Sequence, residues 1–258
     1  MNLTSAQSGA ADTGVISRLR QIMDLLADPS LMNGASATEL SRRAHLALPT
    51  VHRLLLQLAR EEWAYQDPQT KRWYLGLRLI TYGQIAAQKF PFVPIVQPIL
   101  HNIVGNTRET AIFTLREGDY GTYAVIVESP EKLRLTETLG MRLPLTVGAS
   151  RRVILAFLPE QEQRAIITRL CKVNPAVNAA AIQCECRRIV RQGYAISVGE
   201  VTPHTVGVTV PVLLQGRAWG SFMIAGPDTR ITANKIPDLV QQLHHAAQHV
   251  ETVVSQNS

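Results

Sequence analysis

The sequence predicts an α+β protein with two domains, an N-terminal winged helix-turn-helix and a C-terminal domain built on an antiparallel sheet. Two observations predict this order: three helical stripes precede a short hairpin, and alternating strands with separate helices follow. The chain has 258 residues, of which 46% are hydrophobic and 18% charged. That length and composition suit two folded domains rather than a disordered chain.

The N-terminal part begins with a polar stretch and three helices. Residues 1–13 are small and polar, so we expect a flexible tail. Residues 14–27 place apolar side chains on one helical stripe. Ser36, followed by Glu39, has the spacing of a capping box for a short second helix. The segment LALPTVHRLLLQLAREEW (46–63) then forms a third helix with one apolar side and one side rich in hydrogen-bond donors.

A hairpin and a connecting helix follow. Residues 63–76 contain two aromatic-rich runs around the turn sequence DPQT, which predicts a β-hairpin. Helix, helix, turn, helix and hairpin is the order of a winged helix-turn-helix, which we assign to residues 14–76. Residues 77–89 are expected to form a linker helix. A run of prolines then places the domain boundary near Phe90.

Residues 90–258 are expected to form the second domain. A helix is predicted from Pro98 to Asn106. TAIFTLRE and YGTYAVIVE alternate around a Gly-Asp turn as a hairpin, and RLPLTV leads into the helical GASRRVILAFL. Residues 160–192 are mostly helical, three strands follow in YAISVGE, VGVTVPVLL and AWGSFMIAG, and residues 237–254 form a closing helix.

The donor-rich third helix is suited to the major groove of DNA, where the first residues of a recognition helix reach base edges. Basic residues at the end of the second helix and beside the hairpin tip are placed to meet phosphates. The candidate DNA-binding residues are Arg42, Arg43, Leu48, Pro49, Thr50, His52, Arg53, Gln57, Lys71 and Arg72.

The charge distribution supports that interpretation. The chain carries a formal charge of +6, and residues 42–89 hold eight basic and three acidic residues, so +5 of the excess lies in this stretch. The alternative is a three-helix interaction module with a solvated basic face, in a small-molecule sensor or interaction protein without sequence-specific DNA binding. Binding that depends on palindrome sequence and falls steeply with salt would separate the two.

The motifs resemble those of the IclR family, the isocitrate lyase regulator type of bacterial transcription factors. ELSRRAHLALPTVHRLLLQL looks like the family's helix-turn-helix, and RETAIFTL, GMRLPLTVGASRRVILAFLP, RRIVRQGYAISVGE and SFMIAGP resemble its effector-domain blocks in the same order. The resemblance implies a GAF-like effector domain, a cytoplasmic homodimer or homotetramer on a palindromic operator, a dimerising linker helix and regulation of a metabolic, catabolic operon by a small molecule. Arg53 lies in the family's T-V-x-R-L-L run, so it either fixes a phosphate or braces the fold.

The effector site is expected where RLPLTV meets the helix that starts near Gly148. Free N–H groups and the helix dipole favour a carboxylate there, although the residues by themselves also fit a plain strand-to-helix junction. The resemblance favours a pocket wall. The candidate effector-binding residues are Leu143, Gly148, Ala149, Ser150, Arg151, Ser197, Thr205, Gly207, Met223 and Ala225.

The chain departs from the family pattern in that pocket, where Met223 and Ala225 replace polar residues. We therefore expect an organic-acid effector less hydrophilic than glyoxylate or pyruvate, an aromatic or acyl acid whose body lies against Leu143, Met223 and Ala225. For Arg151 three roles remain open: clamping the carboxylate, pairing with Glu200, or pointing to solvent.

Other classes of function have weaker support. No nucleophile-elbow, P-loop, metalloprotease or dinucleotide motif occurs, so we expect no catalytic residues, no enzyme and no cofactor. His245 and His249 share a helix face, and Cys184 and Cys186 do not, so no metal site is expected. The absence of a signal peptide and of an apolar run long enough to span a bilayer favours a cytoplasmic location with no membrane partner.

Overall fold

The computed structural model describes residues 14–89, 92–175 and 177–256, and the chain divides into two compact units at residues 90 and 91. The expected tail at residues 1–13 and the boundary residue Phe90 lie outside the described residues. Each unit is described by itself.

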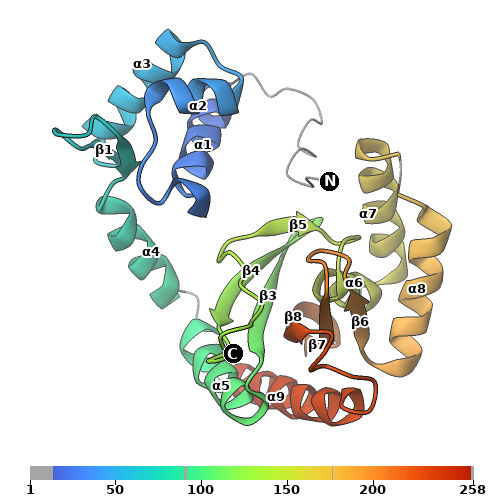
Figure 1. Ribbon diagram of the computed structural model, residues 1–258. Coiled ribbons are helices and arrows are strands. Elements are labelled where there is room, and N and C mark those ends of the chain that lie inside the picture. Colours follow the sequence, from blue (N-terminus) through green and yellow to red (C-terminus); the bar gives the residue numbers. More distant parts are fainter. Residues whose placement is uncertain (1–13, 90–91, 176, 257–258) are drawn as a thin grey trace. The chain divides into compact units, whose positions relative to one another are not determined.

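The N-terminal unit is a winged helix-turn-helix (Figure 1). Its elements are α1 (Val15–Leu26), the 3₁₀ turn η2 (Pro29–Leu31), α2 (Ala37–Ala44), α3 (Leu48–Arg60), β1 (Ala64–Gln66), β2 (Trp73–Leu75) and α4 (Arg78–Lys89). The Ser36 side chain accepts from the Glu39 N–H and caps α2, as the capping-box spacing predicted. Strands β1 and β2 pair antiparallel, and Ala35 bridges to the buried Trp73, so the hairpin is tied to the start of α2.

The C-terminal unit is built on a six-stranded antiparallel sheet with the order β5-β4-β3-β8-β7-β6 (Figure 1). Its strands are β3 (Thr110–Glu117), β4 (Tyr120–Val127), β5 (Arg142–Pro144), β6 (Ala195–Val198), β7 (Thr205–Leu214) and β8 (Arg217–Pro227). Its helices are α5 (Phe92–Thr107), α6 (Ala149–Ala156), α7 (Glu160–Val173), α8 (Ala179–Gln192) and α9 (Ile236–Gln256).

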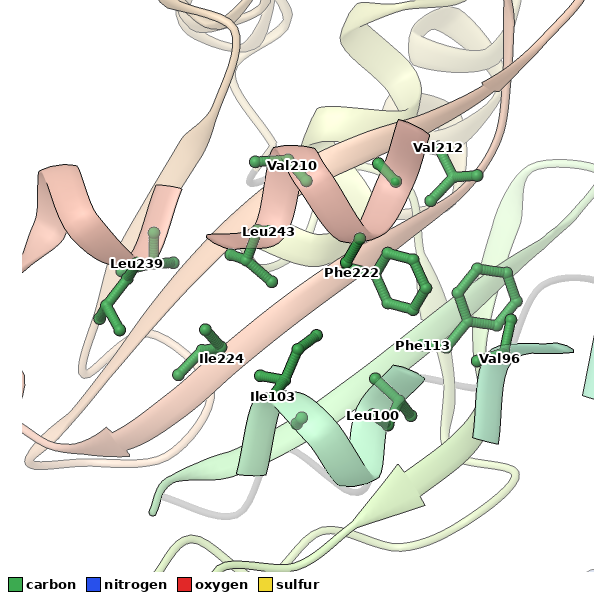
Figure 2. Packing of buried hydrophobic residues seen from close by; sticks show 14 of the residues in the cluster. Val96, Leu100, Ile103, Phe113, Val210, Val212, Phe222, Ile224, Leu239 and Leu243 are labelled. Carbon is green, nitrogen blue, oxygen red and sulfur yellow. The ribbon is translucent and has the colours of Figure 1, made fainter. Parts of the chain in front are cut away.

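Both faces of this sheet are covered. Alternate residues of the strands pack on α5 and α9, where Phe113, Phe222 and Ile224 face Leu100 and Leu243 (Figure 2). The rings of Phe113 and Phe222 lie 5.3 Å apart between centroids. The other face carries α6, whose apolar residues join those of α7 and α8 in a second cluster. Because a β-strand alternates its side chains between the two faces, the residues next in sequence to those of the α5–α9 core point to the face that carries α6.

A β-bulge changes this alternation in β4. Phe113 pairs with Val125, whereas the next residue, Thr114, pairs with Tyr123, so Ala124 is an extra residue. Val125 therefore packs in the α5–α9 core, and Tyr123 lies in the cluster on the opposite face. The bulge brings a buried tyrosine to the face that carries α6.

The α+β fold class is confirmed, with an N-terminal helix-turn-helix and a C-terminal antiparallel sheet. One helix differs from the expectation: α5 begins at Phe92 rather than at Pro98. Pro94 lies in its first turn, where the missing N–H needs no helical partner. Pro98 lies inside the helix, against the usual rule for helix interiors.

Candidate functional site

The turn between α2 and α3 fixes the recognition helix. His45 adopts a left-handed conformation with φ 55° and ends α2. The Ser41 hydroxyl donates to the Leu46 carbonyl over 2.6 Å, and Gln21 on α1 donates to the Ala44 carbonyl over 3.0 Å. The apolar side of α3, formed by Val51, Leu54, Leu55 and Leu58, is buried and packs on α1 and α2. The opposite side of α3 is thereby presented outward.

The exposed side of α3 contains most of the candidate DNA-binding residues of this helix. Thr50 is half-buried. The exposed residues are Leu48, Pro49, His52, Arg53, Leu56, Gln57 and Arg60. Leu56 and Arg60 were not among the candidates, and Leu56 is 53% exposed. Leu56 lies within a run of three leucines, so its residue type suggested burial. Its position on the helix turns it away from the buried residues Leu54, Leu55 and Leu58.

The basic candidates differ in how their charges are used. Arg43 pairs with Asp28 at 3.5 Å and Glu39 at 3.3 Å, and Arg72 donates two hydrogen bonds to the Gly34 carbonyl. These two side chains are therefore engaged in contacts within the domain. Within the described part of the chain, three other candidates are exposed and make no ion pair or side-chain hydrogen bond. They are Arg42, Arg53 and Lys71.

The hairpin tip has its own local order. The Asp67 carboxylate accepts from the N–H groups of Gln69 and Thr70, each over 2.8 Å, and these bonds, Thr70 first, lower its pKa. Lys71 takes a left-handed φ of 57°, and its N–H donates to the Asp67 carbonyl over 2.9 Å. The turn therefore presents Lys71 at an ordered tip in the same domain as α3, as a wing requires.

The C-terminal unit has a small cavity on the sheet face that carries α6. It is walled by strands β4, β6, β7 and β8, by the start of α6 and by the loops 128–141 and 199–204. Eight of the ten predicted effector residues line it: Gly148, Ala149, Ser150, Ser197, Thr205, Gly207, Met223 and Ala225. Six residues were missed: Tyr123, Leu135, Glu137, Glu200, Val201 and Thr202. All of these except Tyr123 lie in loops, which carry no periodic pattern from which their place in a cavity could be predicted. Tyr123 was missed because the bulge in β4 moves it to this face of the sheet.

Leu143 and Arg151 are not among the residues lining the cavity. Leu143 lies on the edge strand β5, opposite Gly121. Arg151 is fully buried, so it does not point to solvent, and it is Arg152 that pairs with Glu200. The Arg151 guanidinium donates to the carbonyls of Gly121 and Met141 and to the Tyr123 hydroxyl.

The buried Arg151 nevertheless places its charge close to the cavity. Its Cζ lies 4.3 Å from the Tyr123 ring centroid, a cation–π contact. A Cβ on Gly121 would come within 2.9 Å of the Arg151 side chain, so this position has room only for glycine. A Cβ on Gly148 would lie 3.7 Å from the Arg151 Nη1. The guanidinium therefore lies close to Gly148, the residue that caps α6.

The start of α6 already binds a carboxylate of the protein. Gly148 caps the helix with φ 72°, a conformation that favours glycine, and its N–H donates to the Glu200 Oε1 over 3.1 Å. Arg152 holds the same carboxylate with Nη1 at 3.0 Å and with Nη2. Glu200 shows that this helix start accepts a carboxylate, as its dipole and free N–H groups predict.

The second carboxyl group of the cavity belongs to Glu137. The Thr202 hydroxyl donates to it over 3.3 Å, which joins the two covering loops. Burial raises the pKa of Glu137, while Thr202 and Arg151 oppose that rise. Burial also raises the pKa of the neighbouring Tyr123. The space left between these groups, about 20 Å³, is little more than one water molecule occupies.

The side chains that could bind a metal ion lie apart from one another. Among the residues that the structure describes, no group of three or more His, Cys, Asp or Glu side chains is placed to hold a metal ion. Burial raises the pKa of the Cys186 thiol to about 11, so this cysteine is protonated and unreactive at neutral pH.

No helix in the described ranges is both long and apolar enough to cross a membrane.

The two units match two protein-family models. Residues 15–68 match the IclR helix-turn-helix domain, and residues 84–252 match the C-terminal domain of bacterial IclR transcriptional regulators. A DNA-binding helix-turn-helix joined to an effector-binding domain defines a transcriptional regulator rather than an enzyme. The chain belongs to the IclR family.

Curated relatives are regulators of the same type. The chain is 28% identical over 204 residues to the HTH-type transcriptional regulator KipR of Bacillus subtilis, covering 77% of this chain and 81% of the relative. It is 26% identical over 247 residues to the regulator BhcR of Paracoccus denitrificans, with coverages of 94% and 88%. The repressor AllR of Salmonella typhi is 25% identical over 228 residues, with coverages of 85% and 83%.

Solved structures share the fold. An IclR regulator from Alicyclobacillus acidocaldarius has a TM-score of 0.78 at 24% identity, with 92% of this chain and 97% of that chain covered. An IclR homologue from Microbacterium hydrocarbonoxydans, solved with 4-hydroxybenzoate, has a TM-score of 0.75 at 18% identity, with 93% and 98% covered.

Proposed function

We propose that this regulator acts in the cytoplasm as a dimer or tetramer that binds a palindromic operator of a metabolic, catabolic operon and responds to a small organic acid. The observation that carries the DNA-binding part is the exposed side of α3, which has no acidic residue from Leu48 to Arg60 and belongs to the same unit as the exposed side chains of Arg42 and Lys71. One short helix reads few bases, and a symmetric pair doubles the sequence that is read.

The residues of this surface have separate roles in the proposal. Leu48, Pro49, Thr50 and His52, at the start of α3, contact base edges, and Gln57 supports them further along the helix. Arg42, Arg53 and Lys71 bind phosphates, because their charges are exposed and unpaired within the described residues. Arg43 and Arg72 contribute long-range charge, since their side chains bind within the domain.

The effector in this proposal is an acid with a compact apolar body, and it enters by moving apart the covering loops 128–141 and 199–204, because the cavity of about 20 Å³ has room for little more than one water molecule. Its carboxylate binds the N–H groups at Ala149 and Ser150, beside the site that Glu200 uses, with the charge of Arg151 behind. Leu135, Met223 and Ala225 form the apolar wall, so Leu135 takes the place expected for Leu143. The 4-hydroxybenzoate complex of the Microbacterium homologue supports an aromatic acid in this class of domain.

Assembly is proposed to use α4 and the residue before it. Leu77, Ile80 and Ile85 are 75%, 57% and 47% exposed, an unusual number of bare apolar side chains for one short helix. Sedimentation of an Ile80→Glu/Ile85→Glu variant should show smaller particles than the wild type. Val173→Glu, at an exposed valine of α7, is the control and should leave the mass unchanged.

The effector proposal is tested by calorimetry with aromatic acids, acyl acids, glyoxylate and pyruvate. Tighter binding of an aromatic or acyl acid supports it. Binding of only the small polar acids would show that the apolar wall does not select the ligand. Operator binding at increasing salt tests the DNA-binding part, because a sequence-specific regulator keeps its preference for the palindrome while its affinity falls.

A further inference from the structure

Glu137 is a cavity residue that the family motifs did not point to. It lies in the loop between β4 and β5, and its side chain lines the cavity beside Tyr123 and Leu135. It is half-buried, and the Thr202 hydroxyl contacts it over 3.3 Å, longer than a strong hydrogen bond to a carboxylate.

The two carboxyl groups of the cavity are treated differently by the fold. Glu200 has the Arg152 guanidinium and the Gly148 N–H as partners. For Glu137, no Lys, Arg or His side chain in the described ranges comes within ion-pair distance. Arg151, whose charge acts on the Glu137 carboxyl group, directs its donors to two carbonyls and the Tyr123 hydroxyl. Glu137 is thus an acceptor that faces the cavity with only one weak donor.

Such a group is costly to cover. Closing a ligand over a carboxyl group that has no strong donor removes water without replacing its hydrogen bonds, which weakens binding by roughly tenfold or more. An apolar ligand atom placed against Glu137 would therefore oppose binding. A hydroxyl or ammonium group at the same point would supply the missing donor.

We propose that the effector carries a hydrogen-bond donor, a hydroxyl or amino group, in addition to its carboxylate, and that Glu137 selects for this donor. The inference rests on the proposed organic-acid function of the same cavity. The raised pKa of Glu137, caused by burial, agrees with a carboxyl group that lacks strong donors. Tyr123 and Leu135 line the same cavity, so a phenol or hydroxyalkyl group fits the surroundings.

The test uses matched acids that differ in one donor group. Calorimetry on the full chain compares benzoate with 4-hydroxybenzoate, 3-hydroxybenzoate and 4-(aminomethyl)benzoate, and phenylacetate with mandelate. We expect at least one donor-bearing acid to bind about tenfold more tightly than its parent, the ratio for one well-made hydrogen bond to a charged group. Binding of the parent acid with an equal constant in every pair would overturn the inference and leave the organic-acid effector in place.

Three variants identify the residue responsible. Glu137→Leu should reduce the donor preference to within about threefold, because no acceptor remains. Glu137→Gln keeps a carbonyl acceptor, so it should retain preference for the hydroxyl and lose preference for the ammonium. Glu131→Gln, on the same loop but paired with the exposed Arg108, should behave as the wild type.

The outcomes separate the two proposals. An unchanged donor preference in both Glu137 variants would overturn the role of Glu137. If none of these acids, parent or donor-bearing, binds the wild-type chain, both the effector class and the donor inference fail. Circular dichroism of each variant checks folding, and Glu137→Ala, which also removes the acceptor, replaces Glu137→Leu if the leucine variant does not fold.

Discussion

Replacing Glu200 with glutamine should destabilise the C-terminal unit and expose the start of α6. The Glu200 carboxylate joins the loop 199–204 to the helix through the Gly148 N–H, at 3.1 Å, and through Arg152. Arg152 is 9% exposed and Glu200 33%, so the pair is only partly screened by water. Glutamine keeps the shape and one acceptor but removes the charge.

The expected loss is about 2 kcal/mol. Hydrogen bonds to charged groups contribute about 1.5–3 kcal/mol, and partial exposure of Glu200 favours the lower half of that range. Arg152 retains Glu185 at 3.3 Å, which limits the loss. For a unit of this size, about 2 kcal/mol lowers the melting temperature by roughly 4–8 °C.

Scanning calorimetry of the full chain measures this change, with hydrogen exchange of the α6 peptide as a local readout. Glu117→Gln is the matched control, because its ion pair with Arg142 is about half exposed on both sides and should contribute less than about 1 kcal/mol. If Glu200→Gln shifts melting no more than Glu117→Gln, and α6 exchange is unchanged, the assigned role of Glu200 is wrong.

Three further changes probe the rest of the molecule. Leu55→Ala should cost about 2–5 kcal/mol, because Leu55 is fully buried, whereas Leu56→Ala should change the stability of the N-terminal unit by under about 0.5 kcal/mol; urea unfolding monitored by tryptophan fluorescence compares them. The pKa of Glu162 is lowered, chiefly by its hydrogen bond from Arg116, so its stabilisation is present above its ordinary pKa of 4.5 and is lost as the pH falls through the folded value. The melting-temperature gap between wild type and Glu162→Gln should therefore close as the pH falls from neutral to below 4.5, and a constant gap would contradict this. Arg42→Gln should reduce the salt slope of operator binding by about 0.9 for each phosphate that the variant no longer neutralises, while Arg43→Gln should mainly lower stability; equal slopes would remove Arg42 from the phosphate-binding residues.

Local patterns predicted most of the fold. The apolar stripes of α1 and α3, the Ser36 cap and the aromatic hairpin place a winged helix-turn-helix without long-range information. The alternation in β3, β4, β7 and β8 predicts the strands. Their order in the sheet depends on pairing between distant segments, which periodicity does not specify. The early start of α5 was missed because prolines at positions 94 and 98 argued against a helix there.

The cavity was only partly predictable. Gly148 and Met223 lie at or on regular elements, and the family motif marked them. Glu137 and Thr202 lie in covering loops with no periodic signal, and Tyr123 reaches the cavity through the bulge at Ala124. Two adjacent arginines also have different partners, since a single residue along α6 rotates the side chain by about 100°. The Glu200 pairing that the sequence left open for Arg151 is therefore made by its neighbour.

Operator binding as a function of salt tests the central claim most directly. Footprinting of DNA from upstream of the gene and its neighbours identifies the protected palindrome. The protein is then titrated with this palindrome and with a scrambled copy at several salt concentrations, chosen so that the Debye length changes about twofold to threefold. We predict that affinity for both falls steeply, that the palindrome stays at least about a thousandfold preferred, and that His52→Ala relaxes this preference while leaving the salt slope unchanged. Equal affinity for palindrome and scrambled DNA at every salt concentration would contradict the assignment of α3 as a recognition helix.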